Sequence, residues 1–168
     1  MVTAIKGNAT STFGGNVDVP QIITDAPAFS AYLSATQSIS SATYTKVSID
    51  TENFDTASCF DTSTFRFTPN VAGYYQINGI IRSVTTSQTH FIIVFYKNGS
   101  QITVGTQNRD STSSSNQYSI SDLIYMNGTT DYLELYGYIV GTSPTFDVSS
   151  TTNTSMFSGF LARAVWVQ

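Results

Sequence analysis

The most regular stretch of this 168-residue chain is Tyr132-Leu133-Glu134-Leu135-Tyr136-Gly137-Tyr138-Ile139. Its side chains alternate with a period of two, which is typical of a β-strand, because successive residues of a strand point to opposite faces. One face carries Leu133, Leu135 and Ile139, and the other carries Tyr132, Tyr136 and Tyr138. We expect the aliphatic face in a core and the tyrosine face at a subunit interface, since three tyrosines are too apolar to face only water.

Similar stretches lie on both sides of it, so the chain is predicted to be all-β. Ten stretches of strand length are separated by turn signals: residues 28–33, 44–49, 64–67, 74–84, 91–96, 101–106, 118–126, 132–140, 145–148 and 156–167. That number is typical of a β-sandwich. Asn98-Gly99 and Asn127-Gly128 accept positive φ, so residues 97–100 and 126–129 are predicted to be hairpin turns.

Composition favours the same class of fold. The chain has 14 Ile and 12 Val but only 5 Leu, 2 Glu and 3 Lys, which suits strands and leaves little material for amphipathic helices. Residues 1–25 hold only short apolar pairs between Gly, Asn and Thr, so we expect a connector or stalk end there and one domain over residues 26–168.

Charge and cysteine content exclude several kinds of partner and site. The net charge is −4 and the seven basic residues are scattered, so we expect no nucleic-acid footprint. The longest apolar run, residues 91–96, is far shorter than the roughly 20 residues of a membrane span, so no membrane insertion is expected. Cys59 is the only cysteine, so packing or assembly must stabilise the chain without an internal disulfide.

Four motifs occur in order along the chain. The first spaces Ile49, Asp55, Phe60 and Phe67 ahead of Gly73-Tyr74-Tyr75-Gln76-Ile77. The others are Phe95-Tyr96-Lys97-Asn98-Gly99, Asp131-Tyr132-Leu133-Glu134-Leu135 and Ser155-Met156-Phe157-Ser158-Gly159-Phe160-Leu161. Their spacing and order resemble the signature of C1q-like domains, with isoleucine at 49 and 77 in place of that family's usual phenylalanine. The resemblance covers residues 26–167.

This resemblance implies a ten-stranded jelly-roll β-sandwich, shared with the tumour-necrosis-factor ligands and assembled as a homotrimer. It places Tyr75 and Phe160 in the aromatic core and inter-subunit set. Together with the alternation, it assigns core and trimer packing to Tyr75, Tyr132, Tyr136, Phe157 and Phe160. Residues 7–19 have no collagen triplets and resemble the stalk ends that precede C1q-like heads in bacteriophage tail fibres. Localisation is therefore expected in a virion, with an extracellular protein as the alternative.

Catalytic and metal chemistry have little support. His90 is the only histidine and no Gly-x-Ser-x-Gly element is present, so we expect no enzyme activity. No cofactor is expected apart from a calcium ion. Calcium is a candidate because Asp50, Glu52, Asp55 and Asp61 lie close in sequence and calcium binds carboxylate oxygens. The alternative interpretation of these four residues is a solvated acidic loop that binds no metal. Some C1q-like trimers hold calcium with aspartates ahead of the strand beginning near Tyr118, where this chain has Asn116 and Gln117.

The predicted function is therefore non-catalytic: the trimeric head of a phage tail fibre or virion appendage, with a host cell-surface protein or glycan as partner. The alternatives are a secreted C1q-like ligand or lectin-type protein and a purely structural virion component. Residues 107–117 form the longest predicted surface loop, and Asn108, Arg109 and Asp110 are the candidate receptor-binding residues. The next candidate loop is 141–145.

Overall fold

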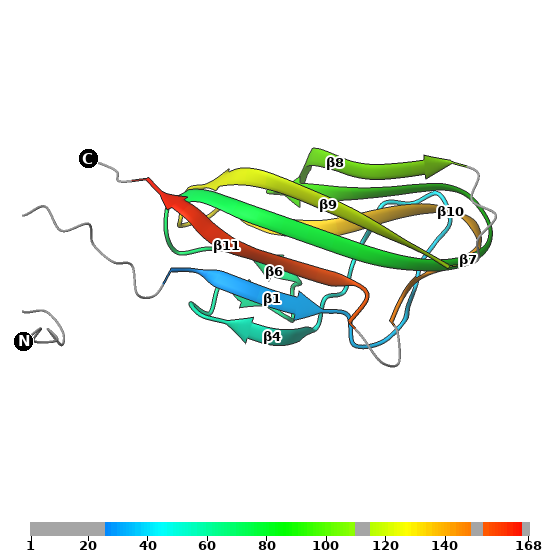
Figure 1. The fold of residues 1–168 in the computed structure, drawn as a ribbon, viewed down its shortest axis with the longest axis horizontal. Helices are drawn as coiled ribbons and strands as arrows, with labels where there is room; N and C mark the ends of the chain where they lie inside the picture. Colours follow the sequence, from blue (N-terminus) through cyan, green and yellow to red (C-terminus); the bar gives the residue numbers. More distant parts are fainter. Residues whose placement is uncertain (1–25, 110–114, 149–152, 166–168) are drawn as a thin grey trace, which may run out of the picture.

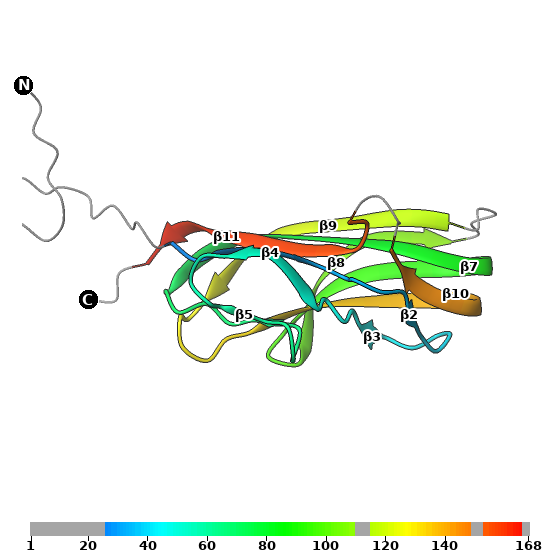
Figure 2. The same ribbon diagram turned by 90° about the horizontal axis from the view of Figure 1, so that it is seen from below.

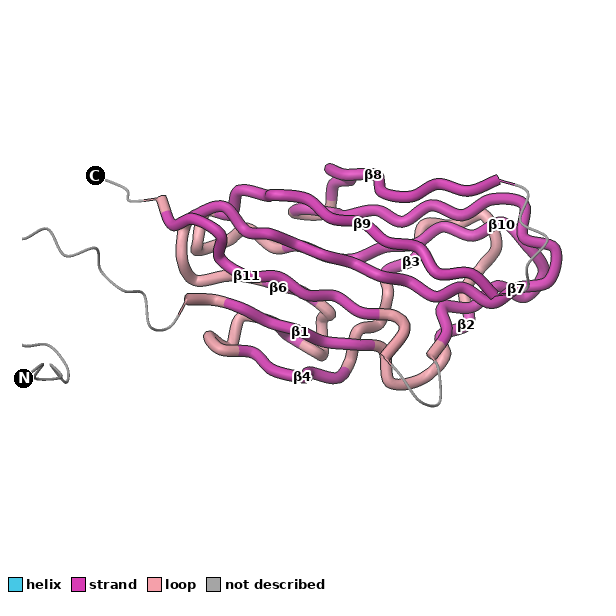
Figure 3. Tube along the Cα trace, viewed as in Figure 1, coloured by secondary structure: helices cyan, strands magenta, loops and turns pink. Residues whose placement is uncertain are grey.

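The computed structural model describes residues 26–109, 115–148 and 153–165, and all of its regular elements are β-strands (Figure 3). The strands are β1 (Ala28–Tyr32), β2 (Gln37–Ser38), β3 (Thr45–Lys46), β4 (Thr51–Asp55), β5 (Phe60–Asp61), β6 (Arg66–Phe67), β7 (Gly73–Lys97), β8 (Ser100–Arg109), β9 (Ser115–Met126), β10 (Leu133–Asp147) and β11 (Met156–Ala164). The described residues include no helix long and apolar enough to cross a membrane.

The strands form two layers that share the long strands β7 and β10 (Figures 1 and 2). The first sheet has the order β4-β1-β11-β7-β9 and uses residues 73–84 of β7. In the second sheet, β10 lies between residues 90–97 of β7 and the short strands β3 and β6, and β8 covers the other edge of β7. All of these pairings are antiparallel, so one face of each sheet can be buried while the other faces outward.

The prediction of ten separate strands is corrected by these long elements. Stretches 74–84 and 91–96 belong to the single strand β7, which bends near Ser87, where φ is 59°. Stretches 132–140 and 145–148 belong to β10, which is irregular around Ser143, with φ of 49°. Polar residues at 85–89 and 141–144 look like breaks in the sequence, but cross-strand bonds between β7 and β10 continue through them, including Thr142 opposite Thr86.

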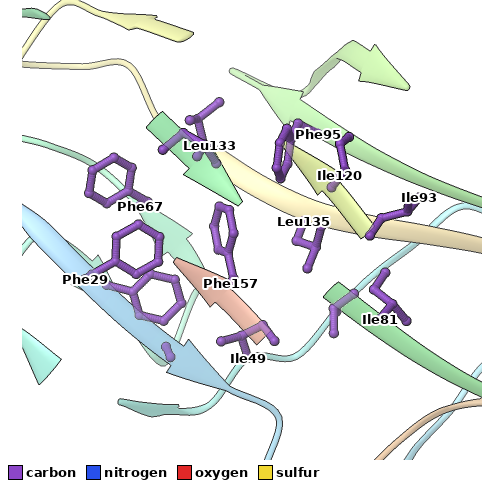
Figure 4. Packing of buried hydrophobic residues seen from close by; sticks show 14 of the residues in the cluster. Phe29, Ile49, Phe67, Ile81, Ile93, Phe95, Ile120, Leu133, Leu135 and Phe157 are labelled. Carbon is purple, nitrogen blue, oxygen red and sulfur yellow. The ribbon is translucent and has the colours of Figure 1, made fainter. Parts of the chain in front are cut away.

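The core between the sheets is rich in phenylalanine and isoleucine (Figure 4). Phe157 of β11 meets the Phe29 ring edge-on at 5.0 Å, and Phe29 stacks on Phe67 at 4.4 Å. Elsewhere in the core, Gly137 leaves room for the Phe146 ring, because a Cβ at position 137 would lie 2.6 Å from that ring. The aliphatic residues of the 132–139 stretch, Leu133, Leu135 and Ile139, are all buried, as the alternation predicts.

Both ends of the described chain lie at one end of the sandwich. The start of β1 pairs with β11 through Ala28 and Phe160, and Val165 donates its backbone N–H to Ala72. The bend of β7 lies at the opposite end (Figure 1). Residues 1–25, the predicted connector, lie outside the described residues.

Only one of the two Asn-Gly dipeptides forms a hairpin. Asn98 and Gly99 have φ of 52° and 78° and join β7 to β8, as predicted. Asn127-Gly128 does not join paired strands, because β9 pairs with β7 in the first sheet whereas β10 belongs to the second. A Cβ on Gly128 would lie 2.4 Å from the backbone nitrogen of Ala72, so this glycine permits a tight crossing between the sheets.

Asp131 forms hydrogen bonds with residues of both Asn-Gly turns. Its carboxylate accepts hydrogen bonds from Asn98 Nδ2 (2.8 Å) and the backbone N–H of Asn127 (3.0 Å), and it pairs with Lys97 Nζ at 2.8 Å. Asn98 Oδ1 also accepts from the backbone N–H of Tyr132. Burial alone would raise the pKa of Asp131, but these three partners together lower it below its ordinary value.

Candidate functional site

The predicted surface loop 107–117 is shorter than expected. β8 continues through Arg109 and β9 begins at Ser115, because both strands pair with β7: Asn108 lies opposite Phe91, and Gln117 lies opposite Arg82. Asn108 is half-buried and its Nδ2 lies 3.5 Å from the Tyr118 hydroxyl. Asp110 lies outside the described residues. Asn108 and Arg109, two of the three candidate receptor-binding residues, therefore lie at a strand end near the bend of β7.

A buried polar cluster lies beneath this end of the sandwich. Gln88 donates from Nε2 to the Tyr118 hydroxyl at 2.6 Å, and its Oε1 accepts from Ser83 Oγ at 2.9 Å. The Tyr118 ring stacks on Phe91 at 3.7 Å. These bonds satisfy both functional groups of the Gln88 amide, so the cluster anchors the bend of β7 to β9.

An apolar face covers the outer side of the first sheet. Its residues are half-exposed aromatic and aliphatic side chains from four strands: Phe54, Tyr74, Leu123, Tyr125 and Phe160. Phe160, Gln76 and Leu123 lie at one level across β11, β7 and β9, and the Tyr74 and Tyr125 rings lie 5.5 Å apart at the next level. A pocket of about 310 Å³ opens there, lined by Tyr74, Leu123, Ala162 and Arg163.

Phe160, predicted to serve core or trimer packing, lies on the outward face of the protomer. Its side chain is 49% exposed, whereas Phe157, three residues earlier on the same strand, is fully buried. The alternation of β11 places the two rings on opposite faces of the sheet. Tyr75 is also fully buried, and its hydroxyl donates to the Val71 carbonyl at 2.7 Å.

A tyrosine face covers the outer side of the second sheet. We define it by five tyrosines and three charged residues: Tyr44, Tyr96, Tyr132, Tyr136, Tyr138, Lys46, Arg66 and Glu134. The Tyr96 and Tyr136 rings stack at 4.1 Å, and the Tyr44 ring lies 4.9 Å from that of Tyr138. Tyr132 and Tyr136, predicted at a subunit interface, are each half-buried within the protomer. Burial raises the pKa of Tyr136 and of Tyr44, so both stay protonated and keep a hydroxyl donor.

Glu134 is the unexpected member of this face. Its side chain is only 2% exposed, and its Oε1 accepts from both Lys46 Nζ (3.0 Å) and Arg66 Nε (2.9 Å). Bonding to Glu134 raises the pKa of Arg66. The Arg66 guanidinium also lies over the Tyr132 ring at 4.1 Å. One feature of the sequence could have indicated these two cations. Glu134 is the single charged residue on the tyrosine side of the alternating 132–139 stretch, and a carboxylate there needs positively charged partners if it is buried.

The four acidic residues considered for calcium do not converge. Asp50 accepts from Ser34, Asp55 from the backbone N–H of Phe60, and Asp61 from Ser63 and Thr64. The hydroxyl and amide donors of Ser63 and Thr64 lower the pKa of Asp61. Among residues 26–109, 115–148 and 153–165, no three His, Cys, Asp or Glu side chains lie close enough to hold a metal ion.

His90 lies at the edge of the tyrosine face. Its ring meets that of Tyr138 edge-on at 5.6 Å, and its buried Nε2 has no hydrogen-bond partner in the described part of the chain. No described serine or threonine hydroxyl therefore bonds to Nε2 as a nucleophile would to its base.

Comparison with solved structures shows which known fold these sheets form. The globular domain of zebrafish complement 1qA protein superposes with a TM-score of 0.57 over 83% of this chain and 99% of its own, at 16% identity. Murine APRIL at pH 8.0 gives 0.60 over 80% of this chain and 98% of its own, at 8% identity. The chain has the C1q and tumour-necrosis-factor-like jelly-roll fold.

A second structure of murine APRIL, at pH 5.0, gives a TM-score of 0.59 at 6% identity, over 81% of this chain and 98% of its own. No family model and no curated protein matches the sequence. The C1q-like fold predicted from the four motifs is thus confirmed by structure. At these low identities the similarity is one of fold.

Proposed function

We propose that this C1q-like domain is the non-catalytic, homotrimeric head of a virion appendage such as a phage tail fibre, and that it binds a receptor on a host cell surface. The observation that carries the proposal is the placement of both ends of the described chain at one end of the sandwich. The bend of β7 and the end of β8 lie at the opposite end of the sandwich from these two ends of the described chain (Figure 2).

The second candidate is a secreted, extracellular ligand or lectin-type domain. The similarity in fold to the globular domain of complement 1qA favours it. Both candidates use the same physical principle, in which three identical surfaces on one rigid head convert weak contacts into avid attachment. The genes that flank this one separate the two, because a virion appendage is encoded among other virion proteins.

The apolar face is the surface that supports assembly. Leu123 and Phe160 are 54% and 49% exposed and have no polar atom to bond with water. A closed ring of three subunits pairs two different surfaces of each subunit. Ile102 and Val104 on the edge strand β8 form a second exposed apolar surface that the first can meet. The proposed trimer therefore buries the apolar face of each subunit against its neighbour.

Light scattering tests this assembly. The protein is expected to have about three times its 18.2 kDa mass at micromolar concentration. Leu123→Asp places a charge in the proposed contact and is expected to produce monomers, because a desolvated, unpaired carboxylate is costly. Ser40→Asp, at an exposed loop position, is the matched control and should stay trimeric. A monodisperse wild-type monomer would contradict the proposed trimer.

Receptor binding is tested at the predicted residues. Replacing Asn108, Arg109 and Asp110 together by alanine is expected to abolish binding of labelled protein to the cells that the wild type recognises. The mass and melting temperature should not change, because backbone pairing of β8 with β7 does not need these side chains. Undiminished cell binding would move the site to another segment at this end, with residues 141–145 next to test.

A further inference from the structure

We propose that a row of polar side chains fixes the register in which identical subunits meet on the outer face of the first sheet. This polar row consists of Ser30, Ser158, Asn78 and Ser121. The inference rests on the proposed function, because it concerns the subunit contact assigned there to the apolar face. It goes beyond that proposal by naming the residues that select one arrangement of two subunits among several with similar apolar contact.

The polar row crosses four neighbouring strands at one level of the sheet. Strand pairing places Ser30 of β1 opposite Ser158 of β11. Asn78 of β7 lies between Ser158 on one side and Ser121 of β9 on the other. The residues next to Asn78 and Ser158 along their own strands are all buried: Ile77, Gly79, Phe157 and Gly159. Because side chains alternate along a strand, the polar row faces outward from the sandwich.

Mainly apolar levels flank the polar row on both sides. Toward the ends of the described chain, the next level contains Ala28, Phe160, Gln76 and Leu123. Toward the bend of β7, the next level contains Tyr32, Met156, Ile80 and Ser119. None of the residues that these four strands place at the three levels is charged, so two copies of a chain of net charge −4 can meet here without opposed like charges. This favours a second copy of the chain as the partner of the face.

Two polar groups of the row are unused within the subunit. Asn78 Oδ1 accepts a hydrogen bond from Ser121 Oγ at 3.0 Å, but neither Asn78 Nδ2 nor Ser158 Oγ donates one within the part of the chain that the structure describes. By contrast, Gln76 Nε2, one level away, donates to Ser121 Oγ at 2.8 Å. On contact with a neighbouring subunit, the half-buried Asn78 and Ser158 lose water and need partners from that neighbour, because burying an unpaired polar group is unfavourable.

This requirement distinguishes registers that apolar contact alone does not. A neighbour that moves by two residues along the strands shifts by about 7 Å, from the level of Leu123 and Phe160 to that of the polar row. Its apolar side chains then cover the Asn78 amide and the Ser158 hydroxyl, which lose their hydrogen bonds to water. In coiled coils, one buried asparagine in an apolar contact fixes the register and the number of subunits at a cost in stability. The polar row has the same role in this sheet.

The combined substitution Asn78→Leu and Ser158→Ala tests the proposal, because it makes the centre of the row apolar with little change in volume. Both side chains face outward, so the fold of the subunit does not depend on them. Native mass spectrometry of the full chain gives the distribution of oligomeric masses. Electron paramagnetic resonance gives the distances between spin labels attached through Ser40→Cys, an exposed position, whereas the natural Cys59 is buried and escapes labelling.

The wild type should show one trimeric mass and one narrow distance between labels. The double variant should still associate, and it should dissociate at a roughly tenfold lower concentration, because a buried amide no longer has to lose water. It should also show more than one oligomeric mass or a broadened distance distribution, since several registers then offer similar contact. Gln76→Met is the matched control, because it removes an amide on the same face of β7 whose Nε2 is bonded within the subunit. This control should behave like the wild type.

Three results would overturn the inference. A double variant with the single mass and single distance of the wild type would show that the row does not select a register. A monomeric double variant would show that the row supplies affinity instead. A Gln76→Met variant as heterogeneous as the double variant would show that any added apolar surface has this effect. A monomeric wild type is a different result, because it contradicts the proposed trimer itself and with it the inference.

Discussion

Phe157→Ala is expected to lower the free energy of unfolding by about 3–5 kcal/mol. The Phe157 side chain is fully buried and touches the rings of Phe29, Phe60 and Phe95, with centroids 5.0 to 6.1 Å away. Alanine removes these contacts and leaves a cavity between the two sheets, which the surrounding β-strands can only partly close. Urea unfolding followed by tryptophan fluorescence or circular dichroism measures the loss.

Phe160→Ala is the matched control, since it makes the same change on the same strand but on the outward face. Within one protomer it removes a half-exposed ring and should cost far less. If Phe160 lies in a subunit contact, the loss of stability caused by Phe160→Ala should grow as the protein is diluted. The reason is that the substitution then weakens association of the subunits, which depends on protein concentration. Equal losses for the two variants at all concentrations would contradict the burial described above.

Asp131→Asn is expected to cost about 2–3 kcal/mol at neutral pH, because it leaves Lys97 without its ion-pair partner and weakens the bonds from Asn98 and Asn127. Those bonds join the β7–β8 hairpin to the crossing between β9 and β10. The loss should appear as a lower urea midpoint with an unchanged slope.

The effect of Asp131 should depend on pH in a defined direction. Its pKa is lowered in the folded state, so its contribution is complete above the unfolded value of about 3.9 and is lost as the pH falls through the folded value. The difference in stability between wild type and Asp131→Asn should therefore shrink as the pH falls below the unfolded value of about 3.9. Asp61, whose pKa is also lowered, is present in both proteins and cancels from the difference. A difference that stays constant with pH would show that the carboxylate charge is not responsible.

The acidic segment after Ile49 shows one limit of pattern-based prediction. Residues 51–55 have no alternation of apolar and polar side chains, and the acidic residues at 50, 52, 55 and 61 predict either a calcium site or a solvated loop. Residues 51–55 form the edge strand β4, because the backbone of β1 offers pairing partners from Phe29 to Tyr32. An edge strand with one exposed face needs few apolar residues, so hydrogen bonding with its neighbour decides its structure.

The segment after Thr106, which contains the candidate receptor-binding residues, is likewise predicted as a loop although part of it forms strands. Residues 107–109 and 115–117 are polar and resemble a loop, yet they pair with residues 90–92 and 82–84 of β7, on the two sides of its bend. The predicted receptor residues therefore belong partly to a strand. The tyrosine face was recognised in the sequence only as far as β10, because Tyr44, Tyr96, Lys46 and Arg66 come from other segments.

The amino-acid sequence by itself determined the all-β class, the Asn98-Gly99 hairpin and the inward side of β10. These features depend on local backbone preferences and on the two-residue period of a strand. Both can be recognised from residues that are adjacent in the sequence. Only the tertiary structure decided that Phe160 faces outward from the protomer, that β7 serves both sheets and that Lys46 and Arg66 meet at Glu134. Glu134 lies 68 residues from Arg66 and 88 from Lys46, and no local rule relates side chains that meet only when distant strands pair.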